Sequence, residues 1–255
     1  MLNTLLQVGS NGQPYYEWLL SGTAWTLGLA ICGWFFAFLI GILVGIGRVS
    51  KSLPYKFMAR LYVEIFRNIP VLVQMFLWYF VLPQVLPTPA GNWIKHIAPP
   101  WGEFIPALIC LSLYTAARVA EQVKAGLESL PKGQGEAAAA LSLSSSATFR
   151  FILLPQAIRL IIPSLTSEVM GIYKNTSVAL TIGVMELTAQ AKAISDETFK
   201  TFTAFGAATI IYLILALLAY KGMSWLDHAI QIPGSVPTPK PSLKRGFLRR
   251  LRGAI

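Results

Sequence analysis

The chain has 255 residues, of which 55% are hydrophobic and only 13% are charged, and its formal net charge is +10. Soluble domains usually carry about 25% charged residues, so this composition excludes an ordinary soluble protein. The basic residues fall between long apolar runs, a pattern that indicates orientation in a membrane and not a nucleic-acid partner.

Five apolar segments are long enough to cross a bilayer as helices, which takes roughly 20 residues each. In chain order they cover residues 22–46, 69–86, 104–120, 161–184 and 205–220. Helices are expected because lipid offers no hydrogen-bond partner to the backbone, so each segment must bond its own amides. The sequence predicts an all-α membrane protein, a single transmembrane domain over residues 1–255 with five transmembrane helices.

The Lys and Arg residues predict the orientation of these spans. Five lie in residues 47–68, five in residues 118–159 and seven in the tail, residues 221–255. The opposite side has only three, which are Lys95, Lys192 and Lys200. By the positive-inside rule, we expect the N-terminus outside and the tail in the cytoplasm. A sixth span would place the basic tail outside, against this rule.

Within the first span, four small residues recur at every fourth position, on one helix face: Gly33, Ala37, Gly41 and Gly45. Small residues allow helix backbones to approach closely in lipid. We therefore expect this face to pack against another helix, in this chain or in a second one. Between the second and third spans, the prolines within residues 83–101 argue against a continuous helix.

A long cytoplasmic loop, residues 121–160, joins the third and fourth spans. Its stretch from Glu136 to Leu141 consists of strong helix formers. The serines within residues 142–146 can end that helix and cap a second one, expected from near Ala147 to Pro155. The sequence thus predicts two short helices at the cytoplasmic surface. The alternative is an amphipathic interfacial loop without a partner.

This loop resembles the signature of permease subunits of bacterial ABC importers: Glu-Ala-Ala, a small residue four positions on, nine residues, then Ile-x-Leu-Pro. The matching residues are Glu136, Ala137, Ala138, Ser142, Ile152, Leu154 and Pro155. The family prefers glycine where this chain has Ser142. Residues 64–70, 114–121 and 174–177 resemble further segments of the polar amino acid group, and residues 117–119 and 166–168 resemble its glutamate/aspartate subgroup.

The resemblance implies a type I ABC importer permease core in the bacterial cytoplasmic (inner) membrane, with the two loop helices coupling it to ATPase subunits. It also implies a second permease subunit, identical or paralogous, and an external substrate-binding protein, with membrane lipid around the spans. The chain has no Gly-x-x-x-x-Gly-Lys-Ser/Thr motif. We therefore expect a translocation subunit rather than an enzyme, with no cofactor of its own and ATP and Mg²⁺ used by the ATPase.

Ionisable residues inside spans are costly and are therefore candidates for function. Glu168 and Lys174 both lie in the fourth span, about 9 Å apart along the axis and on different faces, so they should not pair directly. The candidate substrate pathway consists of Arg118, Glu168, Lys174, Asn175, Thr176 and Ser177. Arg118 could grip a carboxylate in bidentate fashion. The alternative is that these charges are structural groups and Arg118 an ordinary membrane anchor.

The expected cargo is glutamate or aspartate, and the nearest alternative is the same machine carrying another polar amino acid. A membrane enzyme is disfavoured because His96 and His228 are isolated in the sequence and no metal-ligand spacing is visible. An ion channel lined by Lys174 would not need the loop of residues 136–155. In the tail, Phe247 and the apolar residues after it could share a helix face that contacts anionic lipid.

Overall fold

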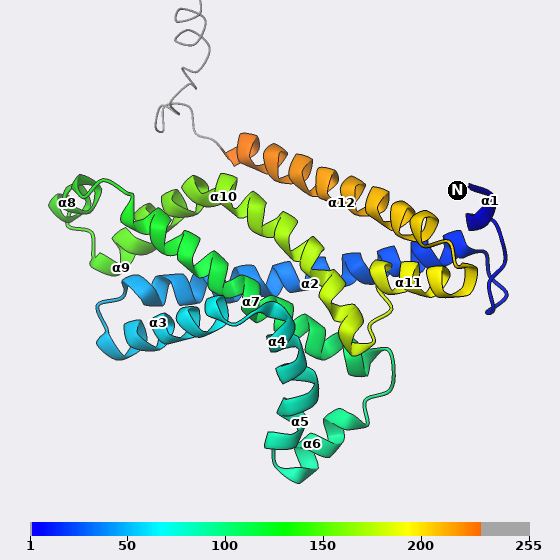
Figure 1. Ribbon diagram of the computed structural model, residues 1–255. Coiled ribbons are helices and arrows are strands. Elements are labelled where there is room, and N and C mark those ends of the chain that lie inside the picture. The colour runs from blue at the N-terminus through cyan, green and yellow to red at the C-terminus, as the bar shows by residue number, and fades with distance from the viewer. Residues whose placement is uncertain (1, 231–255) are drawn as a thin grey trace, which may run out of the picture.

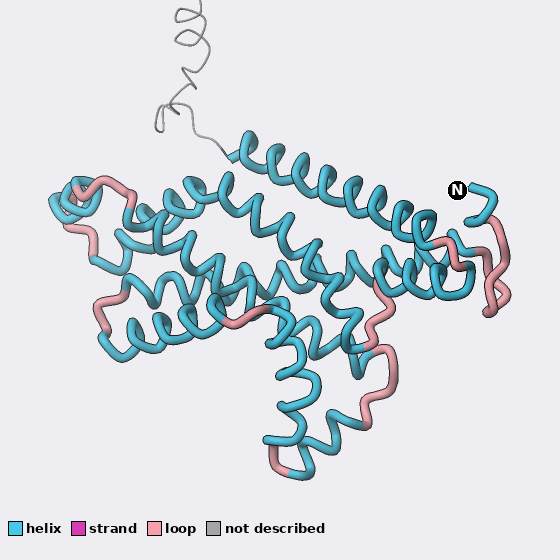
Figure 2. Tube along the Cα trace, in the orientation of Figure 1, coloured by secondary structure: helices cyan, strands magenta, loops and turns pink. Residues whose placement is uncertain are grey.

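The computed structural model describes residues 2–230, so the expected lipid contact of Phe247 and the apolar residues after it lies outside the described residues. The regular structure of the described chain is helical, with one isolated antiparallel bridge between Val8 and Pro14 (Figure 2). The expected all-α class is therefore confirmed. Four long helices form the bundle of Figure 1, and their bounds are α2 Tyr15–Val49, α7 Trp101–Glu128, α10 Leu154–Asn175 and α12 Thr201–Ile230.

The shorter elements lie at the ends of the bundle or beside it. They are α1 Leu2–Leu5, α3 Leu53–Asn68, α4 Val71–Phe76, the π segment η1 Leu77–Val81, α5 Leu82–Val85, α6 Thr88–Lys95, α8 Gly133–Ala140, α9 Ser145–Thr148, the π segment η2 Phe149–Leu153, the 3₁₀ segment η3 Thr176–Ile182 and α11 Leu187–Thr198.

Four helical segments are long and apolar enough to cross a membrane: α2, α7, residues 145–182 and α12. The expected second span, residues 69–86, has a different form. It falls on α4, η1 and α5, which are bent by 105° from α3, so the chain has five spans only if this bent pair is one of them. Pro70, which lies at the bend, explains it, because proline has no N–H to continue the hydrogen-bond ladder of α3.

The second loop helix differs from the prediction, because it does not end at Pro155. The helix that begins at Ser145 continues through η2 into α10. In η2 the hydrogen bonds widen, and the Leu154 N–H bonds to the carbonyl of Phe149. A π turn disturbs the regular ladder, so a proline immediately after it removes little that the helix would otherwise keep.

The small residues of α2 make the expected close helix contact, and the partner is α7 of the same chain. Gly33, Ala37, Gly41 and Gly45 are all buried. A Cβ atom built on Gly45 would lie 2.6 Å from the Cβ of Val123. The hydrophobic core continues from this contact to Leu29, Leu111 and Ile172, where α2, α7 and α10 meet. Backbone proximity at the glycines therefore sets the distance between the two central helices.

We expect Gly41→Ala to destabilise the protein by about 1–3 kcal/mol, because overpacking a close contact has this effect. The added Cβ would lie 2.6 Å from the Cβ of Val119 and 3.0 Å from the Ala116 carbonyl oxygen. Gly28→Ala is the matched control on the same helix, since its nearest neighbour would be the Phe104 ring at 3.8 Å. Thermal unfolding in detergent measures both variants. Equal melting temperatures would contradict the close contact.

Candidate functional site

The loop that joins α7 to α10 projects at the end of the bundle remote from the N-terminus (Figure 1). Its helix α8 begins where Gly133 follows Lys132, and it carries Glu136 in its first turn. The carboxylate therefore lies near the helix N-terminus, where negative charge is favourable. The second helix, α9, is capped by the Ser144 side chain, which accepts a 3.2 Å hydrogen bond from the Ala147 N–H. The first expected short helix is thus present as α8, and the second is present only as α9, the beginning of the helix that continues into α10.

The turn between α8 and α9 is a Schellman motif centred on Ser142. Its N–H bonds to the Ala139 carbonyl at 2.9 Å, and the Leu143 N–H bonds to the Ala138 carbonyl at 3.1 Å. Ser142 has a φ of 58°, in the left-handed region that favours glycine. The serine therefore adopts the backbone conformation for which the resembling family uses glycine, and the turn is retained despite the substitution.

The outward surface of the loop combines one acidic group with apolar side chains. Glu136 and Ala137 are exposed, Leu141 is 76% exposed and Phe151 is 71% exposed. These exposed side chains are available for contact with another molecule. We define these four residues as the loop surface.

Four other signature residues, Ala138, Ile152, Leu154 and Pro155, are not part of the loop surface. Ala138 is only 2% exposed, so the chain itself covers it. A charged side chain at position 138 would therefore disturb the packing inside the loop. Ile152, Leu154 and Pro155 are half-buried in η2 and the first turn of α10.

Arg118 and Glu168 form an ion pair between α7 and α10. The Nε of Arg118 donates to the Glu168 carboxylate at 2.5 Å, and Nη2 donates to its other oxygen at 3.3 Å. The Glu168 side chain is 7% exposed, whereas that of Arg118 is 47% exposed. The buried carboxylate is thus satisfied by a neighbouring helix, while the guanidinium keeps an open side. The structure thus brings two of the predicted pathway residues, Arg118 and Glu168, into direct contact.

Residues 174–177 lie where α10 gives way to the 3₁₀ segment η3. The Thr176 hydroxyl donates to the Tyr173 carbonyl and the Ser177 hydroxyl to the Lys174 carbonyl, both at 2.7 Å. Asn175 is half-buried and Thr176 is fully buried. Lys174 is exposed, and within the described chain its ammonium has no hydrogen-bond or ion-pair partner.

The exposed face of α10 differs from those of the other long helices. From Pro163 onward its exposed residues are Pro163, Ser167 and Lys174, none of them large and apolar. A side chain added at Gly171 would meet nothing within 4 Å. By contrast, α2 and α12 expose large apolar side chains at intervals along their length: Ile31, Phe35, Leu39, Leu43, Ile210, Leu213, Leu217 and Leu218.

Large apolar faces suit lipid, whereas polar groups at membrane depth need water or protein. The face of α10 formed by Ser167, Gly171 and Lys174 therefore suits neither lipid nor a closed core. Together with the open side of Arg118, we define these residues as the polar face. Apart from the paired Glu168, neither α10 nor η3 contains an acidic residue, so the polar face is positively charged.

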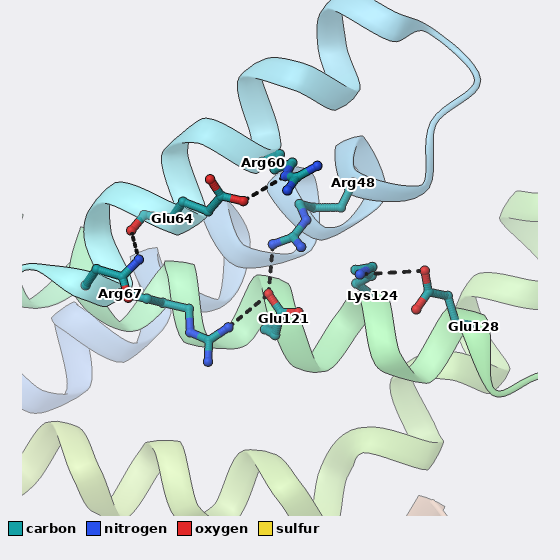
Figure 3. Close-up of polar contacts among 8 residues, drawn as sticks. Arg48, Arg60, Glu64, Arg67, Glu121, Lys124 and Glu128 are labelled. Carbon is teal, nitrogen blue, oxygen red and sulfur yellow. Dashed lines mark hydrogen bonds and ion pairs between the residues drawn. The ribbon is translucent and has the colours of Figure 1, made fainter.

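Sequence reasoning missed a second ion-pair network, which joins three helices (Figure 3). The Glu121 carboxylate of α7 pairs with Arg48 of α2 at 2.8 Å and with Arg67 of α3 at 3.2 Å. Both arginines belong to the basic residues 47–68, from which the sequence predicts only the orientation of the spans. No signal in a single sequence joins residues this far apart, although the charges themselves are visible.

Sequence reasoning also missed two carboxylates of α11 and its N-cap, a helix that lies beside the N-terminal segment of the chain. Glu186 is fully buried and accepts hydrogen bonds from the N–H groups of Thr188 and Ala189 and from the Tyr212 hydroxyl at 2.6 Å. Glu197 accepts from the Ser10 hydroxyl at 2.5 Å, and this bond lowers the pKa of the Glu197 carboxyl below its usual value. Glu186 thus caps the start of α11, and Glu197 links the N-terminal segment to that helix.

The chain is similar to known proteins over most of its length. Residues 37–232 match the family of binding-protein-dependent transport system inner membrane components. The glutamate/aspartate import permease protein GltJ of Escherichia coli strain K12 is 39% identical over 233 residues, which cover 91% of this chain and 95% of that protein. The probable amino-acid permease protein YxeN of Bacillus subtilis strain 168 is 36% identical, over 82% of this chain and 89% of its own.

A solved structure gives a similar result. One chain of the crystal structure of an amino acid ABC transporter with histidines superposes with a TM-score of 0.73 at 29% identity, covering 84% of this chain and 95% of that one. The sequence and structural similarities therefore point to the same kind of protein.

Proposed function

The chain belongs to the family of binding-protein-dependent transport system inner membrane components, and for this permease subunit of an amino acid ABC transporter we propose glutamate or aspartate as the cargo. As a translocation component of the inner membrane it is not an enzyme, and its partners include an ATPase and a binding protein. The similarity to the Escherichia coli glutamate/aspartate permease supports the proposed cargo most strongly. The same machine carrying another polar amino acid is the alternative, since YxeN is also similar.

The charge of the polar face supports an acidic cargo. Lys174 has no partner in the described chain, and Arg118 keeps an open side beyond its pair with Glu168. A carboxylate of the substrate gains a charge-assisted hydrogen bond from either group. Because Glu168 is buried and paired, no acidic side chain of α10 opposes an anionic substrate. We place the substrate pathway along this face, with Asn175, Thr176 and Ser177 at its η3 end.

The loop surface is the proposed contact with the ATPase, on the cytoplasmic side of the membrane. Its apolar residues Leu141 and Phe151 fill a cleft on the ATPase, and Glu136 contributes charge within that contact. Ile152, Leu154 and Pro155 lie where the loop joins α10. Closure of the ATPase, driven by ATP and Mg²⁺ bound there, would then move α10 as a rigid body. A second permease subunit, identical or paralogous, completes the pathway.

Glu136→Arg tests this coupling. Reversing a charge in a buried interface typically costs about 2–5 kcal/mol, so we expect the ATPase to bind about 30-fold to several thousand-fold more weakly. Glu128→Arg is the matched control, because Glu128 is an exposed glutamate at the end of α7. A charge change at such a position usually costs below about 0.5 kcal/mol. Co-purification of the ATPase and substrate-stimulated hydrolysis measure both variants. Wild-type coupling in Glu136→Arg would exclude the loop surface as the contact.

Uptake of labelled amino acids by the reconstituted complex with its binding protein tests the cargo. We expect glutamate and aspartate to be transported and to compete with each other, and glutamine and lysine to compete poorly. Lys174→Met should slow uptake about tenfold or more, since a hydrogen bond to a charged group contributes about 1.5–3 kcal/mol. Lys192→Met is the control, because Lys192 is already paired with Asp196 on α11. Preferential transport of a neutral or basic amino acid would refute the proposed cargo.

A further inference from the structure

Arg118, Glu168 and Lys174 are the only charged residues within residues 104–120 of α7 and residues 161–182 of α10 and η3. Glu168 is therefore the only carboxylate that these two segments could offer to a cationic cargo. Its side chain is 7% exposed, whereas the Arg118 side chain that pairs with it is 47% exposed. An amino acid that moves along the polar face thus meets Arg118, while the carboxylate is covered and already neutralised.

The ion pair occupies one edge of the Arg118 guanidinium and leaves donors elsewhere. Nε and Nη2 donate to the two carboxylate oxygens of Glu168, so the carboxylate lies against the Nε–Nη2 edge. A guanidinium has five N–H donors, and the two on Nη1 lie on the side opposite this edge. The Tyr114 side chain, one turn earlier on α7, also interacts with the guanidinium, but a phenol is neutral. The guanidinium thus keeps N–H donors for a second carboxylate.

The burial of Glu168 determines what the loss of Arg118 would do. Without the guanidinium, Glu168 would be a buried carboxylate without a counter-ion, which is strongly unfavourable. Beside a water-lined pathway, a mobile cation would compensate this charge, and an amino acid with a basic side chain carries one. With the guanidinium in place, the same site repels a cationic side chain and attracts a carboxylate. Repulsion of the wrong ligand and attraction of the right one together give specificity.

We propose that Arg118 selects the charge of the cargo in two ways. It covers the Glu168 carboxylate, which would otherwise bind a cationic side chain, and it donates its remaining N–H groups to the side-chain carboxylate of glutamate or aspartate. This inference rests on the proposed function, since an acidic cargo is what Arg118 would select. A purely structural ion pair, which only joins α7 to α10, is the alternative.

Protection of a cysteine at position 167 tests the proposal in the purified importer complex without its binding protein, so that no other component selects the cargo. The native cysteines are removed, and Ser167→Cys, next to Glu168, is labelled with a neutral maleimide. L-glutamate, L-glutamine and L-lysine are added in turn, and the concentration that halves the labelling rate is measured for each. With Arg118 present, glutamate should protect at a concentration about tenfold or more below that of lysine, the size of effect of a hydrogen bond to a charged group. Arg118→Gln should invert this order.

Two further variants separate charge selection from helix packing. Arg118→Lys keeps a cation beside Glu168 but has no second edge, so lysine should still protect poorly while glutamate protection weakens. Arg118→Gln combined with Glu168→Gln removes the carboxylate as well, so lysine should protect no better than in the wild type. Arg48→Gln is the matched control, because it breaks the 2.8 Å ion pair with Glu121, which also joins two helices but is not part of the polar face. It should leave the glutamate-to-lysine ratio unchanged.

The protection ratios decide between selection and structure. A glutamate-to-lysine ratio in Arg118→Gln equal to that of the wild type would overturn the inference and leave Arg118 a structural residue. Equal protection by lysine in Arg118→Gln and in the double variant would also overturn it, since Glu168 would then play no part. If Arg118→Gln does not assemble, Arg118→Lys and the double variant carry the test, and unchanged glutamate protection in both would overturn the inference.

Uptake by the importer with its binding protein separates this inference from the function on which it rests. If the wild-type importer accumulates glutamate while the protection ratio does not depend on position 118, the proposed cargo stands and the inference falls. Preferential uptake of a neutral or basic amino acid by the wild type would remove the proposed cargo itself.

Discussion

Lipid offers no water to a buried polar group, and most of the polar architecture of this chain follows from that constraint. Three buried or half-buried carboxylates have a partner from another element. Glu121 has two arginines, Glu168 has Arg118, and Glu186 has two N–H groups and the Tyr212 hydroxyl. These bonds connect α7 to α2, α3 and α10, and they connect the start of α11 to α12. Lys174, on the polar face, has no partner in the described chain, so its charge needs water or substrate beside it.

Features with a local signature were predictable from the sequence. The apolar runs predicted the long helices, because a helix needs about 20 apolar residues to cross a bilayer. The four small residues of α2 predicted a close contact, since only a small side chain lets backbones approach. The loop signature predicted the short helix α8 and the turn that ends it. This turn is kept although Ser142 stands where the resembling family prefers glycine. The Ser142 φ of 58° keeps the turn that glycine makes more easily.

Features that depend on distant residues were not predictable in this way. The partner of Glu168 lies on another helix, so a single sequence gives no reason to choose Arg118 over any other cation. The continuation of the helix past Pro155 depends on the hydrogen-bond shift in η2, which has no simple sequence signal. The 105° bend at Pro70 sets α4, η1 and α5 at an angle to α3, and the apolar run of residues 69–86 does not predict this angle. Burial of Ala138 likewise depends on how the loop folds back on itself.

Water accessibility of the polar face tests the central claim most directly. The native cysteines are first removed by Cys32→Ser and Cys110→Ala. Single cysteines are then placed at Ser167 and Gly171, and at Leu217 on the lipid-facing side of α12. A water-soluble, membrane-impermeant thiol reagent is applied to the assembled importer during ATP turnover. We expect positions 167 and 171 to be labelled and position 217 to be protected. Protection of 167 and 171 to the same degree as 217 would mean that the polar face of α10 does not line the pathway.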